Sequence, residues 1–171
     1  MFDLFRPAIR AALVMGSLSV VACAPRDPVW DMPCADRPAR EVEVGTGAEE
    51  IRSADGGLYI ENGSQGGQHI WISVRMRGFG PEASLKYGIH DAEDPSIVYS
   101  GPLTEHVDLS YDPEAEASEA LGLYGYLTTR YDPITQEPLP GPEGKSVVLW
   151  AEVSDACSPD AVLGEATGEV Q

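Results

Sequence analysis

Apolar and polar residues alternate along most of the chain after residue 40, with the two-residue period of β-strands. The clearest run covers residues 68–77, where one row is apolar and the opposite row is largely polar. The apolar row is Ile70, Ile72, Val74 and Met76, and the other row is His69, Trp71, Ser73, Arg75 and Arg77. We expect the first row to lie in the core and the second row to be half-exposed. Shorter runs of the same kind cover residues 41–44, 58–61, 83–90, 97–99, 106–110, 121–128, 147–153 and 163–170.

Turn-forming residues separate these runs. Asp55-Gly56-Gly57 and Asn62-Gly63 are turn signals, residues 112–119 form an acidic loop or one helical turn, and the loop at 132–144 carries four prolines. Seven to nine short strands at regular spacing predict a single all-β domain over residues 41–171, built as an antiparallel β-sandwich. We expect an immunoglobulin-like topology, with a jelly roll or a small barrel as the alternative.

The first 22 residues have the layout of a secretory signal. Arg6 and Arg10 precede an apolar run of 12 residues at 11–22, which is shorter than the roughly 20 residues needed to span a bilayer. Because this run is short and follows positive charges, we predict a signal peptide over residues 1–22. The alternative is an uncleaved anchor.

A cysteine follows this segment directly. Val20-Val21-Ala22-Cys23 has the order of a bacterial lipobox, so we predict that Cys23 carries a lipid and holds the protein on a membrane of the cell envelope. Ala24 rather than Asp follows the cysteine, and resemblance to Gram-negative lipoproteins then implies the outer membrane. The alternative is a plain signal peptide with an incidental cysteine.

The chain has three cysteines, an odd number for an exported protein. Lipidation of Cys23 leaves Cys34 and Cys157, an even pair in an oxidising compartment. A bridge between these residues, which are 123 positions apart, would clip the two ends of the domain together rather than join the sheets. On the loop-entropy model it would destabilise the unfolded chain by about 4–5 kcal/mol. Two free thiols are the alternative.

Residues 23–40 are rich in proline, which predicts an extended tether between the lipid and the domain. At about 3.1 Å per residue, the segment up to Pro33 would lift the domain about 30 Å from the membrane. Without Arg6, Arg10 and Asp3, the 11 basic and 28 acidic residues become 9 and 27, a net charge near −18. Such a surface repels nucleic acid and anionic lipid head groups, so no nucleic-acid partner is expected.

Three short motifs resemble a pattern of uncharacterised exported lipoproteins of myxobacteria-like bacteria. They are Gly45-Thr46-Gly47, the Asp55-Gly56 turn, and the run Gln65-Gly66-Gly67-Gln68-His69-Ile70-Trp71 that opens the longest strand. The resemblance covers about 45 residues. It implies a β-sandwich and a location in the cell envelope, and it implies no activity.

The histidines and the acidic clusters raise the question of a metal. His69, His90 and His106 all lie on polar rows of expected strands, so adjacent strands in register would bring them to one transition metal. The alternative is three unrelated surface histidines. Acidic groups at 91–94 and 108–119 offer the oxygen ligands that Ca²⁺ requires, although charge runs are usually solvated.

Catalytic motifs give little support for an enzyme. Residues 78–83 match the spacing of a dinucleotide-binding loop, but a strand rather than a helix is expected after them, so no helix N-terminus holds a pyrophosphate. We therefore expect no enzymatic activity and no resident cofactor. Ca²⁺ or transition-metal binding is the alternative function, and a small envelope hydrolase is a weaker one.

Aromatic residues suggest a binding surface instead. Trp71, Tyr124 and Tyr126 lie on rows opposite the core rows, where exposed rings suit a carbohydrate or a protein partner. The alternative is that the second sheet, or the loop at 132–144, covers these rings. The function we expect is a lipid-anchored envelope protein with a non-catalytic role in binding or structure.

Overall fold

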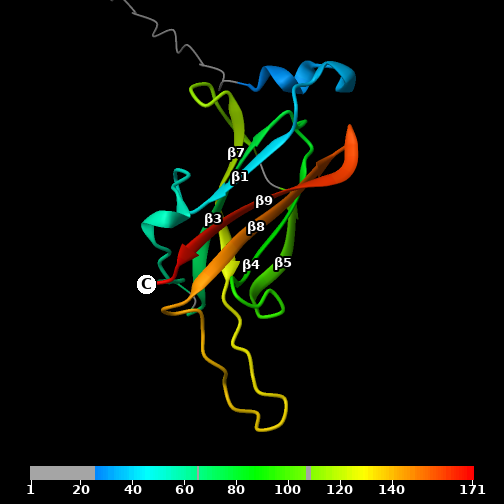
Figure 1. The fold of residues 1–171 in the computed structure, drawn as a ribbon. Helices are drawn as coiled ribbons and strands as arrows, with labels where there is room; N and C mark the ends of the chain where they lie inside the picture. Colours follow the sequence, from blue (N-terminus) through cyan, green and yellow to red (C-terminus); the bar gives the residue numbers. More distant parts are fainter. Residues whose placement is uncertain (1–25, 65, 107–108) are drawn as a thin grey trace, which may run out of the picture.

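The computed structural model describes residues 26–64, 66–106 and 109–171 as two antiparallel sheets packed together (Figure 1). The strands are β1 (Glu41–Gly45), β2 (Glu61–Asn62), β3 (Gln68–Arg77), β4 (Ser84–Asp91), β5 (Val98–His106), β6 (Ser110–Asp112), β7 (Ala117–Tyr126), β8 (Ser146–Asp155) and β9 (Ser158–Glu169). One sheet has the order β1-β3-β7-β6, with β2 also paired to β3, and the other has the order β5-β4-β8-β9.

These strand orders confirm the predicted β-sandwich. The first sheet corresponds to strands A, B, E and D of an immunoglobulin-like domain, and the second to strands C′, C, F and G. Each sheet is open at both edges in its hydrogen bonding, so neither closes into a barrel. The strand order therefore agrees with the expected immunoglobulin-like topology rather than with a jelly roll or a small barrel.

The alternating rows place the core as the sequence predicts. Ile70, Ile72, Val74 and Met76 of β3 are buried between the sheets. They face the inner rows of the second sheet, which are Leu85, Tyr87 and Ile89 of β4 and Val147, Leu149, Ala151 and Val153 of β8. Because side chains alternate across a strand, burying these rows forces the intervening residues onto the outer faces.

Two strands differ from their expected bounds where the pairing is irregular. Strand β7 begins at Ala117, four residues before the expected run, and its pairing with β3 shifts between Ile72 and Val74. At this bulge one residue of β3 lies opposite two residues of β7, so the alternation of inward and outward residues along β7 changes phase. For this reason the sequence pattern did not predict the first half of β7. Strand β5 is longer than expected and reaches His106, and residues 107–108 lie outside the described part.

The first edge strand is interrupted. Strand β1 pairs with the second half of β3, and β2 continues along the same edge from Glu61 opposite His69. Between them the chain crosses to the other sheet, where Leu58 bridges in parallel to Val170 beyond the end of β9. The strand expected at 58–61 is therefore reduced to this bridge and the two residues of β2.

The structure does not show the extended segment expected at the N-terminus for residues 26–40. Two short 3₁₀ helices, η1 (Pro28–Asp31) and η2 (Cys34–Asp36), pack across one end of the sandwich (Figure 1). Asp27 is buried there, and its Oδ2 accepts a hydrogen bond of 2.7 Å from Ser118 Oγ. Proline suits the first position of a helical turn, so Pro28 starts η1 instead of extending the chain.

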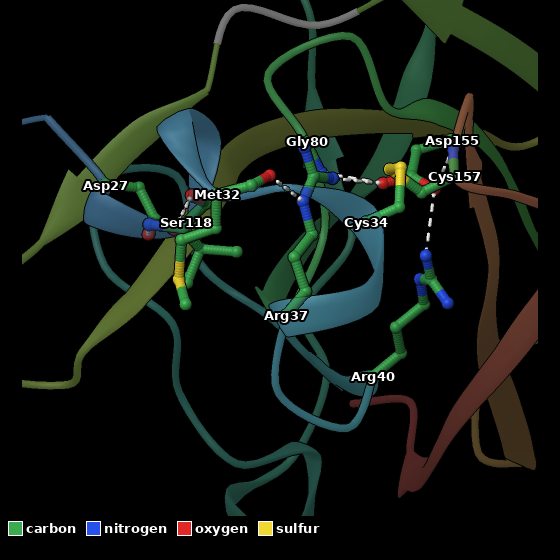
Figure 2. A network of polar contacts seen from close by, with 10 residues as sticks. Asp27, Met32, Cys34, Arg37, Arg40, Gly80, Ser118, Asp155 and Cys157 are labelled. Carbon is green, nitrogen blue, oxygen red and sulfur yellow. Dashed lines mark hydrogen bonds and ion pairs between the residues drawn. A yellow bond between two sulfur atoms is a disulfide. The ribbon is translucent and has the colours of Figure 1, made fainter.

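A disulfide joins this segment to the turn between β8 and β9. Cys34 and Cys157 are bonded, with their Cα atoms 5.4 Å apart, which confirms the predicted pairing. Beside it the carboxylate of Asp155 accepts hydrogen bonds from Arg37 Nη1 at 3.0 Å and Arg40 Nη2 at 3.3 Å (Figure 2). The backbone N–H groups of Gly80 and Cys157 also donate to Asp155, at 2.8 and 3.0 Å. One buried carboxylate thus links three separate segments.

We predict that Asp155→Ala strongly destabilises the fold. The Asp155 side chain is only 2% exposed, and its loss leaves Arg37 and Arg40 without their carboxylate. Removing one partner of a buried ion pair typically costs about 3–5 kcal/mol, and we expect the lower part of that range because both arginines retain some contact with water. Urea unfolding at neutral pH, with the disulfide intact, measures the loss.

The matched control is Glu165→Ala, which removes an exposed carboxylate from β9. We expect its free energy of unfolding to stay within about 0.5 kcal/mol of the unsubstituted protein. A loss below about 1 kcal/mol for Asp155→Ala would show that the two arginines do not depend on this carboxylate.

Candidate functional site: an aromatic patch on the outer face of one sheet

The pairing of β3 with β7 brings the predicted surface aromatics together. Trp71 lies directly opposite Tyr124, and His69 lies opposite Tyr126. All four side chains point away from the core, because their neighbours on β3, Ile70 and Ile72, fill it. We refer to His69, Trp71, Tyr124 and Tyr126 as the aromatic patch.

The rings of the patch are in mutual contact. The His69 ring centroid lies 4.4 Å from that of Trp71 and 4.9 Å from that of Tyr124, in edge-to-face arrangements. Tyr124 and Tyr126 are stacked, with centroids 5.2 Å apart and planes 8° from parallel. Both geometries suit the ring quadrupoles, so the patch is an ordered cluster rather than four separate side chains.

Two residues of the row expected to be half-exposed, His69 and Ser73, are buried instead, and His69 is the one that belongs to the patch. His69 is 3% exposed, because the neighbouring rings cover it. Its Nε2 is buried and has no hydrogen-bond partner among the described residues. A buried nitrogen of this kind is unusual, since most buried polar atoms are paired.

The two tyrosines of the patch stay open to solvent. Tyr124 is 42% exposed and Tyr126 is 52% exposed. The second sheet does not cover them, because it packs on the other face of this sheet. The loop at 132–144 does not cover them either, because it extends from the end of the domain (Figure 1). The structure therefore favours an exposed aromatic face over a covered one.

Shallow depressions flank the patch on both sides. One has a volume of about 420 Å³ and is lined by Gly63, Ser64, Gly67, His69, Tyr124 and Tyr126. The other has a volume of about 360 Å³ and lies beside Trp71, where Tyr59 and Glu61 form part of its wall. Tyr59 was not predicted as a site residue, although it stands between the two turn signals that shape this surface.

Two side-chain hydrogen bonds join the segment after β1 to the strand that carries the patch. Thr46 Oγ1 donates to the carbonyl of Trp71 at 2.8 Å, and Ser73 Oγ donates to the carbonyl of Gly47 at 2.6 Å. Gly122 has a φ of +66°, and a Cβ there would lie 2.8 Å from the carbonyl oxygen of Ala48, so only glycine fits. The segment after β1 therefore packs closely against the bulge and helps to position the strands that carry the aromatic patch.

The rest of this outer face is charged. Arg75 pairs with Glu119 at 2.7 Å and with Glu43 at 3.2 Å, and Arg77 pairs with Glu41 at 3.5 Å. Although burial alone lowers the pKa of Arg75, the two carboxylates outweigh it and raise that pKa. The aromatic patch thus occupies one half of the face, and ion pairs occupy the half nearer the N-terminal segment.

The structure does not bring the three histidines together. His69 lies in the first sheet, whereas His90 and His106 lie in the second. His90 pairs with Val98 and His106 with Ser84, which places them at opposite ends of the β4–β5 pair. Across the described residues, no group of three or more histidine, cysteine or acidic side chains is placed to hold a metal ion.

Several members of the acidic clusters have hydrogen-bond or ion-pair partners within the fold. Asp91 accepts hydrogen bonds from the Tyr99 hydroxyl at 2.8 Å, from Lys145 Nζ at 3.2 Å and from the backbone of Glu93 at 2.9 Å. Asp112 Oδ1 accepts from the backbone N–H of Glu114, as in many turns. These carboxylates stabilise turns and ion pairs instead of converging on a calcium site, and Asp108 lies outside the described residues.

Comparison with known protein families, curated proteins and solved structures finds no match to this chain. In the part of the chain that the structure describes, no helix is long and apolar enough to cross a membrane. Cys23 and the predicted signal peptide lie outside the described residues. The contacts, burial and charges of the patch are therefore the grounds for interpreting it.

We predict that Asp91 makes the stability of the fold depend on pH under acidic conditions. The hydrogen bond from Tyr99, followed by those from the backbone and Lys145, lowers the pKa of Asp91 to about 2. A lowered pKa stabilises the fold above the ordinary value of about 3.9, and this contribution is lost as the pH falls toward about 2. Asp91→Asn should therefore be less stable at pH 7, by a margin that narrows below about pH 4.

Urea unfolding of both proteins at neutral and acidic pH measures this margin. The control, Glu93→Gln, removes an exposed carboxylate from the same turn and leaves the Asp91 contacts in place. A margin for Asp91→Asn that stays constant down to about pH 2 would contradict the assignment.

Proposed function

We propose that the protein is a lipid-anchored component of the cell envelope that binds a ligand on the aromatic patch and has no catalytic role. The observation that carries this proposal is the patch itself, where ordered aromatic rings remain exposed around a buried and unpaired His69 nitrogen. Exposed clusters of large apolar side chains in soluble domains commonly mark binding surfaces. The lipobox supports the anchor and, with Ala24, the outer membrane of a Gram-negative bacterium.

The docking of the N-terminal segment supports a particular orientation. Cys23 precedes the buried Asp27 by four residues, and a fully extended chain spans at most about 3.6 Å per residue. An acylated Cys23 would thus hold this end of the sandwich within about 14 Å of the membrane surface. Strand β3 runs away from the patch toward Arg77 and Gly78, which pack against Pro38 and Ala39. The patch then belongs to the half of the domain farther from the membrane.

A binding role accounts for these features better than the alternatives. The histidines expected to bind a metal lie apart, and Asp91 and Asp112 of the acidic runs accept hydrogen bonds within their own turns. Glu119, from the acidic run, is paired with Arg75 and is not free for acid–base chemistry. The outer aromatic face has no such structural partner among the described residues, apart from its own rings.

We predict that Cys23→Ser abolishes the anchor. The variant should lose fatty-acid labelling and move from the membrane to the soluble envelope fraction, because the thiol is the site of acylation. Metabolic labelling and fractionation measure both effects. The double variant Cys34→Ser/Cys157→Ser keeps Cys23 and should remain labelled. Unchanged labelling and membrane association of Cys23→Ser would contradict the anchor.

We predict that the patch is occupied in the envelope. Hydroxyl-radical footprinting of intact cells should modify Trp71, Tyr124 and Tyr126 several-fold less than it does in the purified protein, because a bound ligand shields their rings. Tyr131 is 57% exposed in the long loop and is the internal control, with equal modification in both samples. Equal modification of the three patch residues in cells and in solution would contradict the binding role.

A further inference from the structure

We infer that the ligand of the aromatic patch is an uncharged carbohydrate, with a pyranose ring stacked on Tyr126 and hydroxyl groups paired with His69 and Ser64. This inference rests on the proposed binding function and names the class of ligand. It follows from the ring surfaces, the unpaired nitrogen and the charge of the depression beside the patch.

The ring surfaces suit the apolar face of a sugar. Tyr124 covers one face of the Tyr126 ring by stacking at 5.2 Å, and Tyr126 is still 52% exposed. The electron-rich face of an aromatic ring attracts groups that carry partial positive charge. The C–H groups on one face of a pyranose ring carry such charge, so a sugar ring can lie flat on the open side of Tyr126.

The unpaired nitrogen supplies a specific polar contact. His69 lines the depression together with Ser64, and its Nε2 has no partner among the described residues. The rings of Trp71, Tyr124 and Tyr126 surround the imidazole, with centroids 4.4, 4.9 and 6.4 Å from its own, so a ligand reaches this nitrogen when one of these rings moves aside. A sugar hydroxyl both donates and accepts hydrogen bonds, and it pairs with the imidazole nitrogen in either tautomer.

The charge around the depression disfavours anionic ligands. Its six lining residues, Gly63, Ser64, Gly67, His69, Tyr124 and Tyr126, include no lysine, arginine, aspartate or glutamate. The chain as a whole has a net charge of −17, which repels anionic ligands at longer range. An anionic sugar would therefore find no cation in this depression, and the charged residues Arg52 and Glu61 line the depression on the other side of the patch.

The shape of the depression favours a carbohydrate over a protein. Glycine and serine, rather than aliphatic side chains, form the wall opposite the tyrosines. Stable protein interfaces bury at least about 1,000 Å² around an apolar centre, whereas the large exposed apolar side chains of this patch are only its two tyrosines. Backbone amides and hydroxyl groups beside an aromatic ring instead match the mixed surface of a sugar.

Titration calorimetry on the mature protein in detergent tests the inference. The probes are short oligosaccharides of glucose, of mannose, of galactose and of N-acetylglucosamine, and an oligosaccharide of uronic acids as the anionic probe. We expect at least one uncharged probe to bind and the anionic probe to give no heat. Tyr126→Ala should weaken binding at least about 10-fold, and His69→Phe, which keeps a ring but removes the nitrogen, about 3–10-fold.

Two control variants keep the test specific. Tyr131→Ala removes an equally exposed tyrosine outside the patch, and His106→Phe makes the same replacement at an exposed histidine of β5. Both should bind as the unsubstituted protein does. Thermal melting of each variant establishes that the sandwich is intact.

The outcomes separate this inference from the proposed function. If no uncharged probe binds but the patch is shielded in cells, the ligand is not a carbohydrate of these classes and the binding role stands. If the patch is also unshielded, both proposals fail. Tighter binding of the anionic probe, or unchanged binding by Tyr126→Ala, would overturn the assignment of an uncharged sugar to this site.

Discussion

The apolar row of β3 is the constraint on which the rest of the domain depends. Ile70, Ile72, Val74 and Met76 must be covered by the second sheet, because leaving them in water would cost about 1.5–3 kcal/mol for each side chain. Their burial determines the outward direction of His69 and Trp71. The pairing of β3 with β7 then places two tyrosines beside them. The patch is therefore a consequence of how the core is formed.

Two local departures from regular pairing shape this outer face. The bulge near Ser73 accommodates the segment after β1, which hydrogen-bonds to β3 through Thr46 and Ser73. The same segment crosses to the second sheet at Leu58, so the first edge strand is split into β1 and β2. The turn between β2 and β3 lies next to the exposed tyrosines and forms the wall of the depression. Irregular backbone and candidate binding site thus coincide.

A cluster of hydrogen bonds and ion pairs lies at the end of the domain away from the patch. Asp155 accepts bonds from two arginines and two backbone groups beside the disulfide, and Asp27 pairs with Ser118. These contacts make residues 26–40 part of the domain. In the proposed orientation they keep this end of the sandwich near the membrane, and the aromatic patch lies on the half that faces away from it.

The sequence by itself determined the fold class and the core rows of β3, β4 and β8, because these follow from local alternation and do not depend on strand order. Counting cysteines made Cys34 and Cys157 the expected pair, but only the structure excluded two free thiols by placing their Cα atoms 5.4 Å apart. The sequence also singled out Trp71, Tyr124 and Tyr126, since an outward row can be recognised once the core row is known. The lipid on Cys23 and the envelope location remain predictions from the N-terminal motif.

Only the tertiary structure decided which outward residues meet. Strand pairing joined His69 to the three aromatics and buried it, while it separated His69 from His90 and His106 by placing them in different sheets. The proline-rich segment, expected as a tether, instead packs against the end of the domain, because Asp27, Cys34, Arg37 and Arg40 contact partners 91 to 123 positions away. Alternation reports which side of a strand a residue occupies, but proximity between strands depends on contacts that are distant in the chain.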